Sequence, residues 1–297
     1  MVVLDRIIEL DSLLKKIVKY DTDGEIINEL IERKIIKLED ILSFAINSNV
    51  FTNIYFAGKN VKNINLDKLE NKVIEMNNFN NMIKFSNIDN VNVKKFEDKV
   101  ISLNDFKCLC DFAKNVKNVN MERFEDLVIK TNNLKYILKF AIEVRNANQE
   151  KLADVIINSG NTYFMMLFAI HVKKAPVERI LDKIIEIGNA DEIITMAFEF
   201  NDDYLDKLTN AIINTKDAYS ICEFAITVEK DLTKEMALKL AEAVMEYGNN
   251  MDIHYFIANI RKAPVDILNE KIKENERNLK LKEFKKKVRQ KLRIKAS

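Results

Sequence analysis

The amino-acid sequence predicts an all-α protein built as an α-solenoid of about eight to nine stacked short helix pairs. Three observations predict this fold class. An aromatic or methionine residue recurs about every 28 residues, a turn residue recurs seven positions before it, and the apolar residues around it follow a helical period. In addition, five glycines and two prolines in 297 residues are too few for a chain rich in strands and tight turns.

The recurring aromatic or methionine residue, here called the anchor, marks the repeats. The anchors are Phe56, Phe85, Phe112, Phe140, Phe168, Met196, Phe224 and Phe256, spaced by 29, 27, 28, 28, 28, 28 and 32 residues. The turn residues before them are Asn49, Asn78, Asp105, Asn133, Asn161, Asn189, Asp217 and Asn249. Gly160, Gly188 and Gly248 directly precede three of these, where we expect a helix-ending residue with positive φ.

Each repeat reads as two short helices. The first is apolar at positions −3, −2, 0, +1 and +4 from the anchor, which is one face of a helix. The second carries an apolar column made of Leu69, Phe96, Phe124, Leu152, Ile180, Leu208 and Leu240. Because so short a pair cannot bury its own apolar faces, neighbouring repeats must stack into one continuous core.

The sequence divides into three regions. Residues 1–50 form a divergent N-terminal helical cap, residues 51–276 hold the repeats, and residues 277–297 form a basic amphipathic C-terminal helix or tail. Both prolines, Pro176 and Pro264, lie in the tripeptide Ala-Pro-Val, three repeats apart. We expect each in the first turn of a second helix, where the missing N–H is tolerated.

The wording "FAIHVKKAPVERILDKIIEIGN" resembles the αα-repeat solenoid class, and in particular short helical repeats of uncharacterised bacterial and phage proteins. The resemblance covers roughly residues 50–276. The period differs from those of tetratricopeptide repeats (about 34), ankyrin repeats (about 33) and HEAT or armadillo repeats (about 40 or more). It implies a fold, and it brings no catalytic or binding residues with it.

Composition indicates a cytoplasmic protein. Three cysteines without framework spacing favour a reducing compartment. The start "MVVLDRIIELDSLLKK" has acids within its apolar stretch and no cleavage site of small residues, so we do not expect a signal peptide. No apolar run approaches the length of a membrane span.

The motifs of catalysis and metal binding are missing from the sequence. There is no glycine-rich phosphate loop, no G-x-S-x-G and no H-E-x-x-H. Of the two histidines, His171 and His254, the second shares a register with Cys110 and Cys222, so we expect it in the core. The thiols are interpreted as small apolar residues. We therefore expect no enzyme activity, no cofactor and no metal.

One column of the second helices is basic and is a candidate binding site. A basic residue directly precedes each apolar column residue, and an acid or amide follows three residues after it. The basic residues include Lys95, Arg123, Lys151, Arg179 and Lys207. We expect each to pair with the acid or amide on its own helix. The column is then either a structural ladder of charges or a stripe that binds a polyanion or an acidic peptide.

The C-terminal tail is the second candidate. Residues 271–297 hold 12 Lys or Arg and 3 Glu, whereas the whole chain has a net charge of only +1. Leu281, Phe284, Val288 and Leu292 follow a helical spacing, and the basic candidates around them are Lys285, Lys286, Lys287, Arg289, Lys291 and Arg293. Three interpretations are open: a C-terminal cap of the solenoid, an electrostatic arm for RNA, DNA or an acidic protein, and a membrane-surface helix.

These observations predict a non-enzymatic scaffold or adaptor that binds a protein or peptide through a solenoid surface, including an inhibitor or regulator that wraps its partner. The alternative is a nucleic-acid-associated protein, in which the basic tail and the Lys/Arg column contact the phosphate backbone. The predicted partner is another protein or peptide in the first case and nucleic acid in the second.

Overall fold

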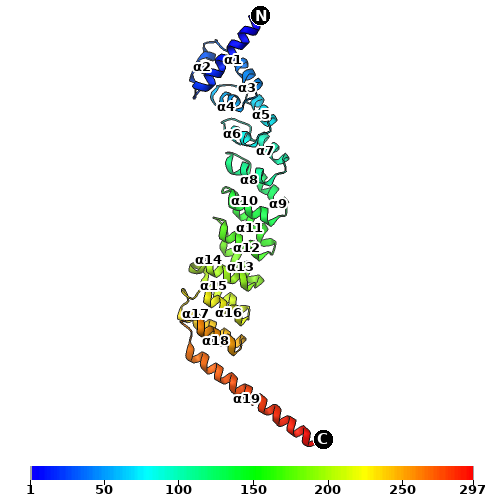
Figure 1. Cartoon of the computed structure of the whole chain (residues 1–297), viewed down its shortest axis with the longest axis vertical. Helices are drawn as coiled ribbons and strands as arrows, with labels where there is room; N and C mark the ends of the chain where they lie inside the picture. The colour runs from blue at the N-terminus through cyan, green and yellow to red at the C-terminus, as the bar shows by residue number, and fades with distance from the viewer. Residues whose placement is uncertain (1, 297) are drawn as a thin grey trace. The chain divides into compact units, whose positions relative to one another are not determined.

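The computed structural model describes the backbone of residues 2–296, and Figure 1 shows that helices are its only regular secondary structure. It contains nineteen α-helices and no strand within these residues, and helices that are neighbours in the chain pack against one another. The predicted all-α solenoid is confirmed. The chain divides into two compact units, unit 1 (Met1–Asn148) and unit 2 (Gln149–Ser297), and each is described by itself.

Unit 1 contains the predicted N-terminal cap and the first repeats. Its helices are α1 (Val2–Tyr20), α2 (Glu25–Glu32), α3 (Leu38–Asn47), α4 (Phe51–Asn60), α5 (Leu66–Glu75), α6 (Phe79–Ser86), α7 (Val93–Ser102), α8 (Phe106–Asn115), α9 (Met121–Lys130) and α10 (Leu134–Glu143). The first helices of its repeats are α4, α6, α8 and α10, and each contacts the next. They therefore form one layer of the unit.

Unit 2 continues the alternation of first and second helices. Its helices are α11 (Gln149–Asn158), α12 (Thr162–His171), α13 (Val177–Ile187), α14 (Ala190–Glu199), α15 (Asn201–Asn214), α16 (Ala218–Thr227), α17 (Lys234–Tyr247), α18 (Asn250–Asn259) and α19 (Val265–Ala296). The first helices α12, α14, α16 and α18 again contact one another in order.

The core lies between the two helix layers of each unit. Every anchor is buried, and so is every member of the apolar column on the second helices. The rings of Phe112 on α8 and Phe124 on α9 stack with centroids 6.0 Å apart. Truncating such a buried ring to alanine costs about 3–5 kcal/mol, so the periodic residues supply most of the stability of each repeat.

Asparagine occupies most of the positions with positive φ in the described part of the chain. Seven asparagines have positive φ, namely Asn49, Asn63, Asn77, Asn90, Asn104, Asn118 and Asn132. Asparagine adopts this left-handed conformation more readily than other residues except glycine. Four of the seven asparagines, Asn49, Asn77, Asn104 and Asn132, lie in the turn before a first helix. In unit 2 that turn uses Gly160 (φ 70°) and Gly188 (φ 78°), as predicted, and Lys216 (φ 58°).

Gly248 departs from this prediction. Its φ is −98°, so it is not a left-handed residue. A Cβ atom at this position would lie 2.9 Å from the Cβ of Ala218 and 2.7 Å from the carbonyl oxygen of Val244. Glycine is needed here because α16 and the end of α17 approach each other closely.

The turn residues before the anchors begin the first helices. In seven of the eight repeats their side chains cap the helix by accepting a hydrogen bond from a backbone N–H of its first turn; the caps are Asn78, Asp105, Asn133, Asn161, Asn189, Asp217 and Asn249. Asn49 is the exception, because it is the left-handed residue and Val50 precedes α4. Pro176 and Pro264 directly precede α13 and α19, one residue before the predicted position.

The part of α19 that follows Ile272 does not cap the last repeat. Leu268 and Ile272 of α19 are buried, but Leu279, Leu281 and Phe284 are 60%, 50% and 63% exposed. The interpretation as a cap is therefore wrong for these residues. Its physical reason is that no glycine, proline or left-handed residue follows Ile272, so the helix continues instead of turning back. The side chains of Val288 and Leu292 lie outside the described residues.

Across the described part of the chain, none of the helices combines the length and the apolar character that crossing a membrane requires.

Replacing Asn104, which has φ 51°, tests the role of the left-handed asparagines. We expect Asn104→Val to lower the free energy of unfolding by about 1–2 kcal/mol, because a β-branched side chain clashes with the backbone at positive φ. Asn104→Gly is expected to leave it unchanged or raise it. Urea denaturation measures both, with Asn80→Val on the exposed side of α6 as the control. Equal losses for the two valine variants would contradict this role.

Candidate functional site

The basic column of the second helices is paired with carboxylates, but not in the way the spacing predicts. Lys95 contacts Asp67 and lies 3.1 Å from Oε2 of Glu70, both on the preceding second helix. Arg123 is 2.6 Å from Oδ1 of Asp98 on the preceding second helix. The prediction of pairs within one helix is wrong here, because second helices lie side by side and the long cations reach across to the neighbour.

The same pattern holds within unit 2. Arg179 on α13 pairs with Glu150 and Asp154 on α11, and Lys207 on α15 pairs with Asp182 on α13. Lys151 also has an interaction partner. Lys239 is different, since it pairs with Glu235 one turn earlier on its own helix.

Three buried glutamates lie on the same second helices as this column, and the sequence analysis did not identify them. Glu70, Glu97 and Glu125 are only 2–3% exposed. Their Oε1 atoms accept hydrogen bonds of 2.7–2.8 Å from the backbone N–H groups of Asn92, Asn120 and Asn148, at the loop before the next second helix. The available signal was a glutamate directly after the apolar column residue in three successive repeats.

The buried glutamates and the column form one network in unit 1. Glu97 binds both the N–H of Asn120 and the guanidinium of Arg123. Hydrogen bonding to Asp98 raises the pKa of Arg123, and Arg123 in turn lowers the pKa of Asp98. A phosphate group would have to displace these carboxylates. The pairing therefore favours the interpretation of the column as a structural ladder of charges. Binding of a polyanion or an acidic peptide by this column stays a prediction.

The outer side of the first helices in unit 2 is apolar and exposed. Large apolar side chains there point away from the core, with exposed fractions of 54% for Tyr163, 67% for Phe198, 61% for Tyr219, 80% for Met251 and 40% for Tyr255. We call these five residues the aromatic face. They lie at positions −5, −1 and +2 from the anchors, which share one side of a helix opposite the buried side.

The aromatic face lies on four helices that are neighbours. The helices α12, α14, α16 and α18 contact one another in this order. The hydroxyl of Tyr255 on α18 donates a hydrogen bond of 2.8 Å to Oε1 of Glu223 on α16. This bond raises the pKa of Tyr255 and fixes its ring beside the neighbouring helix.

Charge separates the first helices of the two units. Those of unit 2 contain no Lys or Arg, and their acids are Asp191, Glu192, Glu199, Glu223 and Asp252. Those of unit 1 carry Lys59, Lys84, Lys107, Lys114, Lys135 and Lys139 against two acids, Asp111 and Glu143. The aromatic face thus combines exposed apolar side chains with negative charge, and the corresponding helices of unit 1 do not.

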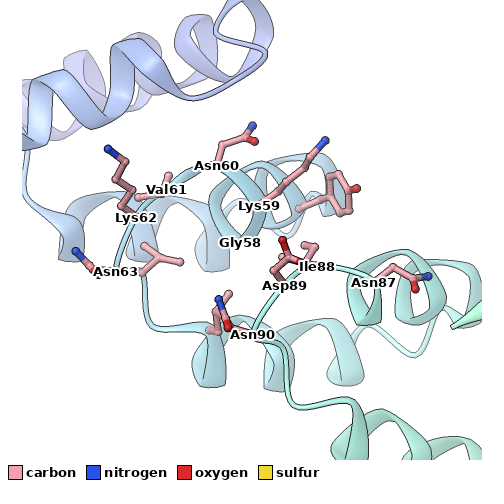
Figure 2. Close-up of a pocket in the computed structure, with 13 residues that line it drawn as sticks. Gly58, Lys59, Asn60, Val61, Lys62, Asn63, Asn87, Ile88, Asp89 and Asn90 are labelled. Carbon is pink, nitrogen blue, oxygen red and sulfur yellow. The ribbon is translucent and has the colours of Figure 1, made fainter. Parts of the chain in front are cut away.

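Unit 1 has a hollow of about 490 Å³ between the loops that follow α4 and α6, shown in Figure 2. Its lining is mostly polar and includes Lys59, Lys62 and Asn87. The side chain of Asn87 already donates to the carbonyl oxygens of Ile83 and Asn115 and accepts from the N–H of Lys117. Asn87 therefore ties successive repeats together and is not available to a ligand.

Two of the three cysteines are buried, and His254 is exposed. Cys110 and Cys222 are buried, and burial raises the pKa of both thiols to about 12. His254 is exposed, so its predicted place in the core is wrong. The corresponding Cys222 is covered by the next first helix, where its Sγ lies 3.7 Å from the carbonyl oxygen of Asp252, whereas α18 is the last first helix of the described residues. In the part of the chain that the structure describes, no three His, Cys, Asp or Glu side chains lie together as metal ligands.

The basic candidates of the tail lie on the exposed part of α19. Lys285, Lys286, Lys287 and Arg289 are exposed. The side chains of Lys291 and Arg293 lie outside the described residues.

Comparison of the chain with protein-family models, with curated proteins and with solved structures finds no match.

Replacing Glu97 tests the buried glutamate network. We expect Glu97→Ala to lower the free energy of unfolding by about 2–4 kcal/mol, because it leaves the N–H of Asn120 and the charge of Arg123 without their buried partner. The exposed Glu122→Ala on α9 is the matched control, and urea denaturation measures both. A loss for Glu97→Ala no larger than that of the control would show that the network does not stabilise the repeats.

Proposed function

We propose that this protein is a non-enzymatic binding scaffold whose aromatic face binds a basic, amphipathic helix of a partner protein. The observation that supports the proposal is the aromatic face itself, five large apolar side chains exposed on four adjacent helices that carry acids but no bases. Large apolar side chains exposed on the same side of neighbouring helices are typical of interaction sites.

Burial of these side chains would provide the binding free energy. Fully burying one large apolar side chain is worth about 1.5–3 kcal/mol. Tyrosine suits such a role, because its ring packs against apolar groups while its hydroxyl keeps a polar partner, as Tyr255 does with Glu223. A few well-packed aromatic residues commonly carry most of the energy of an interface.

The chemistry of the partner follows from the backbone and the charges of the face. Helices satisfy their own backbone hydrogen bonds, so the face offers no strand edge to which an extended peptide could add. A helical partner satisfies its own backbone and presents apolar anchors on one side. Its remaining sides should be basic, since acids such as Asp191, Glu199 and Glu223 lie on these helices without any Lys or Arg.

The scaffold is expected to act in the cytoplasm. Its three cysteines, Cys108, Cys110 and Cys222, are unpaired, which supports a reducing compartment.

Two substitutions on the face test the proposal. The probe is a synthetic helical peptide of about 20 residues with Leu and Phe on one side and Lys on the others, compared with the same peptide carrying Glu in place of Lys. We expect the wild-type chain to bind the basic peptide only, and Phe198→Ser/Tyr219→Ser to weaken binding at least about tenfold. Fluorescence anisotropy measures the affinities.

The control for this experiment is Ile35→Ser, since Ile35 is also an exposed apolar residue but lies in unit 1. It should not change the affinity. Equal binding of the acidic and basic peptides, or unchanged binding by the double variant, would refute the proposed use of the face.

A second candidate function is nucleic-acid binding through α19. The exposed Lys285, Lys286, Lys287 and Arg289 favour it. The exposed Leu281 and Phe284 on the same helix weigh against it, because phosphate contacts need no apolar side chains.

Salt dependence tests this second function. If α19 binds the phosphate backbone, the affinity for duplex DNA or RNA should fall steeply with salt, with a slope of about −0.9 per phosphate contact for DNA. Lys285→Gln/Lys286→Gln/Lys287→Gln should reduce that slope by about three. An unchanged slope in the variant would remove α19 from the nucleic-acid interface.

A further inference from the structure

We propose that the aromatic face of unit 2 binds the exposed C-terminal part of α19 from a second copy of this chain. This inference rests on the proposed function of the face and names its partner. It assigns one role to the two exposed features of unit 2 that its own packing leaves unexplained, the aromatic face and the projecting basic helix.

Charge complementarity is the first argument. Residues 149–270 hold 12 Lys or Arg against 21 Asp or Glu, a net charge of −9. Residues 271–297 hold 12 Lys or Arg against 3 Glu, a net charge of +9. The two parts of unit 2 are therefore opposite in sign, and contact between them neutralises charge that neither part neutralises within itself.

Apolar complementarity is the second argument. Leu281 and Phe284 are three residues apart on α19, so they lie on one side of the helix and both are exposed. Lys286 and Lys287 follow on the other sides of the helix, and Lys285 flanks the apolar edge next to Leu281. A basic helix with an apolar edge is the partner that the exposed rings and acids of the aromatic face fit best.

The continuity of α19 indicates that the bound helix comes from another copy. Leu268 and Ile272 anchor the start of α19 in the last repeat, and the helix then runs unbroken to Ala296. With a rise of about 1.5 Å per residue, the segment beyond Ile272 extends about 35 Å. Figure 1 shows this segment leading away from α17 and α18. A chain could not place it on its own face without breaking the helix.

When two copies exchange α19, each copy contributes one helix and one aromatic face. Two copies that exchange helices form two equivalent contacts, whereas exchange that does not close would build longer assemblies. In both cases every contact requires an intact face on one copy and an intact helix on the other. This requirement makes the proposal testable by complementation.

The experiment uses two full-length variants, one damaged in each part. The face variant is Phe198→Ser/Tyr219→Ser, and the helix variant is Lys285→Glu/Lys286→Glu/Lys287→Glu. All five side chains are exposed, so both variants should keep the fold, which circular dichroism and thermal melting check. Analytical ultracentrifugation at low salt and at concentrations up to about 100 µM measures association.

We expect the wild-type chain to self-associate and each variant alone to do so at least about tenfold more weakly. A mixture of the two should form a mixed complex, because the intact helix of the face variant meets the intact face of the helix variant. Two controls should behave as wild type: Ile35→Ser for the apolar change and Lys68→Glu/Lys107→Glu/Lys135→Glu for the charge change, all at exposed positions of unit 1.

A monomeric wild-type chain, undiminished association of either variant, or no mixed complex would overturn the proposal. The helix variant separates failure of this inference from failure of the proposed function, because its aromatic face is intact and no α19 that could bind it is present. If it binds the basic peptide probe while the wild-type chain is monomeric, the face has a different partner. If duplex DNA binds the monomeric wild-type chain but not the helix variant, α19 belongs to nucleic acid and the inference is wrong.

Discussion

The structure depends on one constraint: helices of about ten residues cannot bury their apolar sides alone. Isolated helices this short are marginal in water, so each repeat is stable only against its neighbours. The anchors, the apolar column of the second helices and the capping residues all serve this stacking. Once two sides of every helix are used for it, the remaining side is free to vary, and that is where the two units differ.

The units solve the problem of register in different ways. Unit 1 fixes successive second helices with a buried carboxylate that binds the next loop and a base of the next helix. Unit 2 places Ala153, Leu181, Thr209 and Ala241 at the corresponding positions, all of them buried. Packing and the exposed ion pairs between neighbouring second helices hold the register there. The same repeat thus carries its distinctive residues in different places in the two units. In unit 1 they are buried glutamates between repeats, and in unit 2 they are exposed apolar side chains on the first helices.

The sequence was sufficient for features that recur in every repeat, because a period of 28 residues repeats the same physical environment. The anchors and most caps follow from it. Glu97 and its equivalents were missed because a charged residue beside lysines reads as exposed, and only the neighbouring helix reveals its burial. His254 was misplaced because α18 is the last first helix of the described residues, so the side that the next repeat covers at Cys222 stays exposed there. The aromatic face was not recognised because large apolar residues occupy positions −5, −1 and +2 from the anchor in only some of the repeats, so they form no column of the 28-residue period.

The buried glutamates give unit 1 a direction, and this has a consequence for how such an array can change in evolution. Each carboxylate belongs to one repeat while its N–H and cationic partners belong to the next. Duplication of a whole repeat within unit 1 copies the glutamate together with the N–H group and the base that bind the preceding glutamate. The array then lengthens with every buried carboxylate still paired. A repeat transferred from unit 2 would accept the preceding glutamate but offer none of its own. Unit 1 can therefore grow by copying itself, but it cannot freely exchange modules with unit 2.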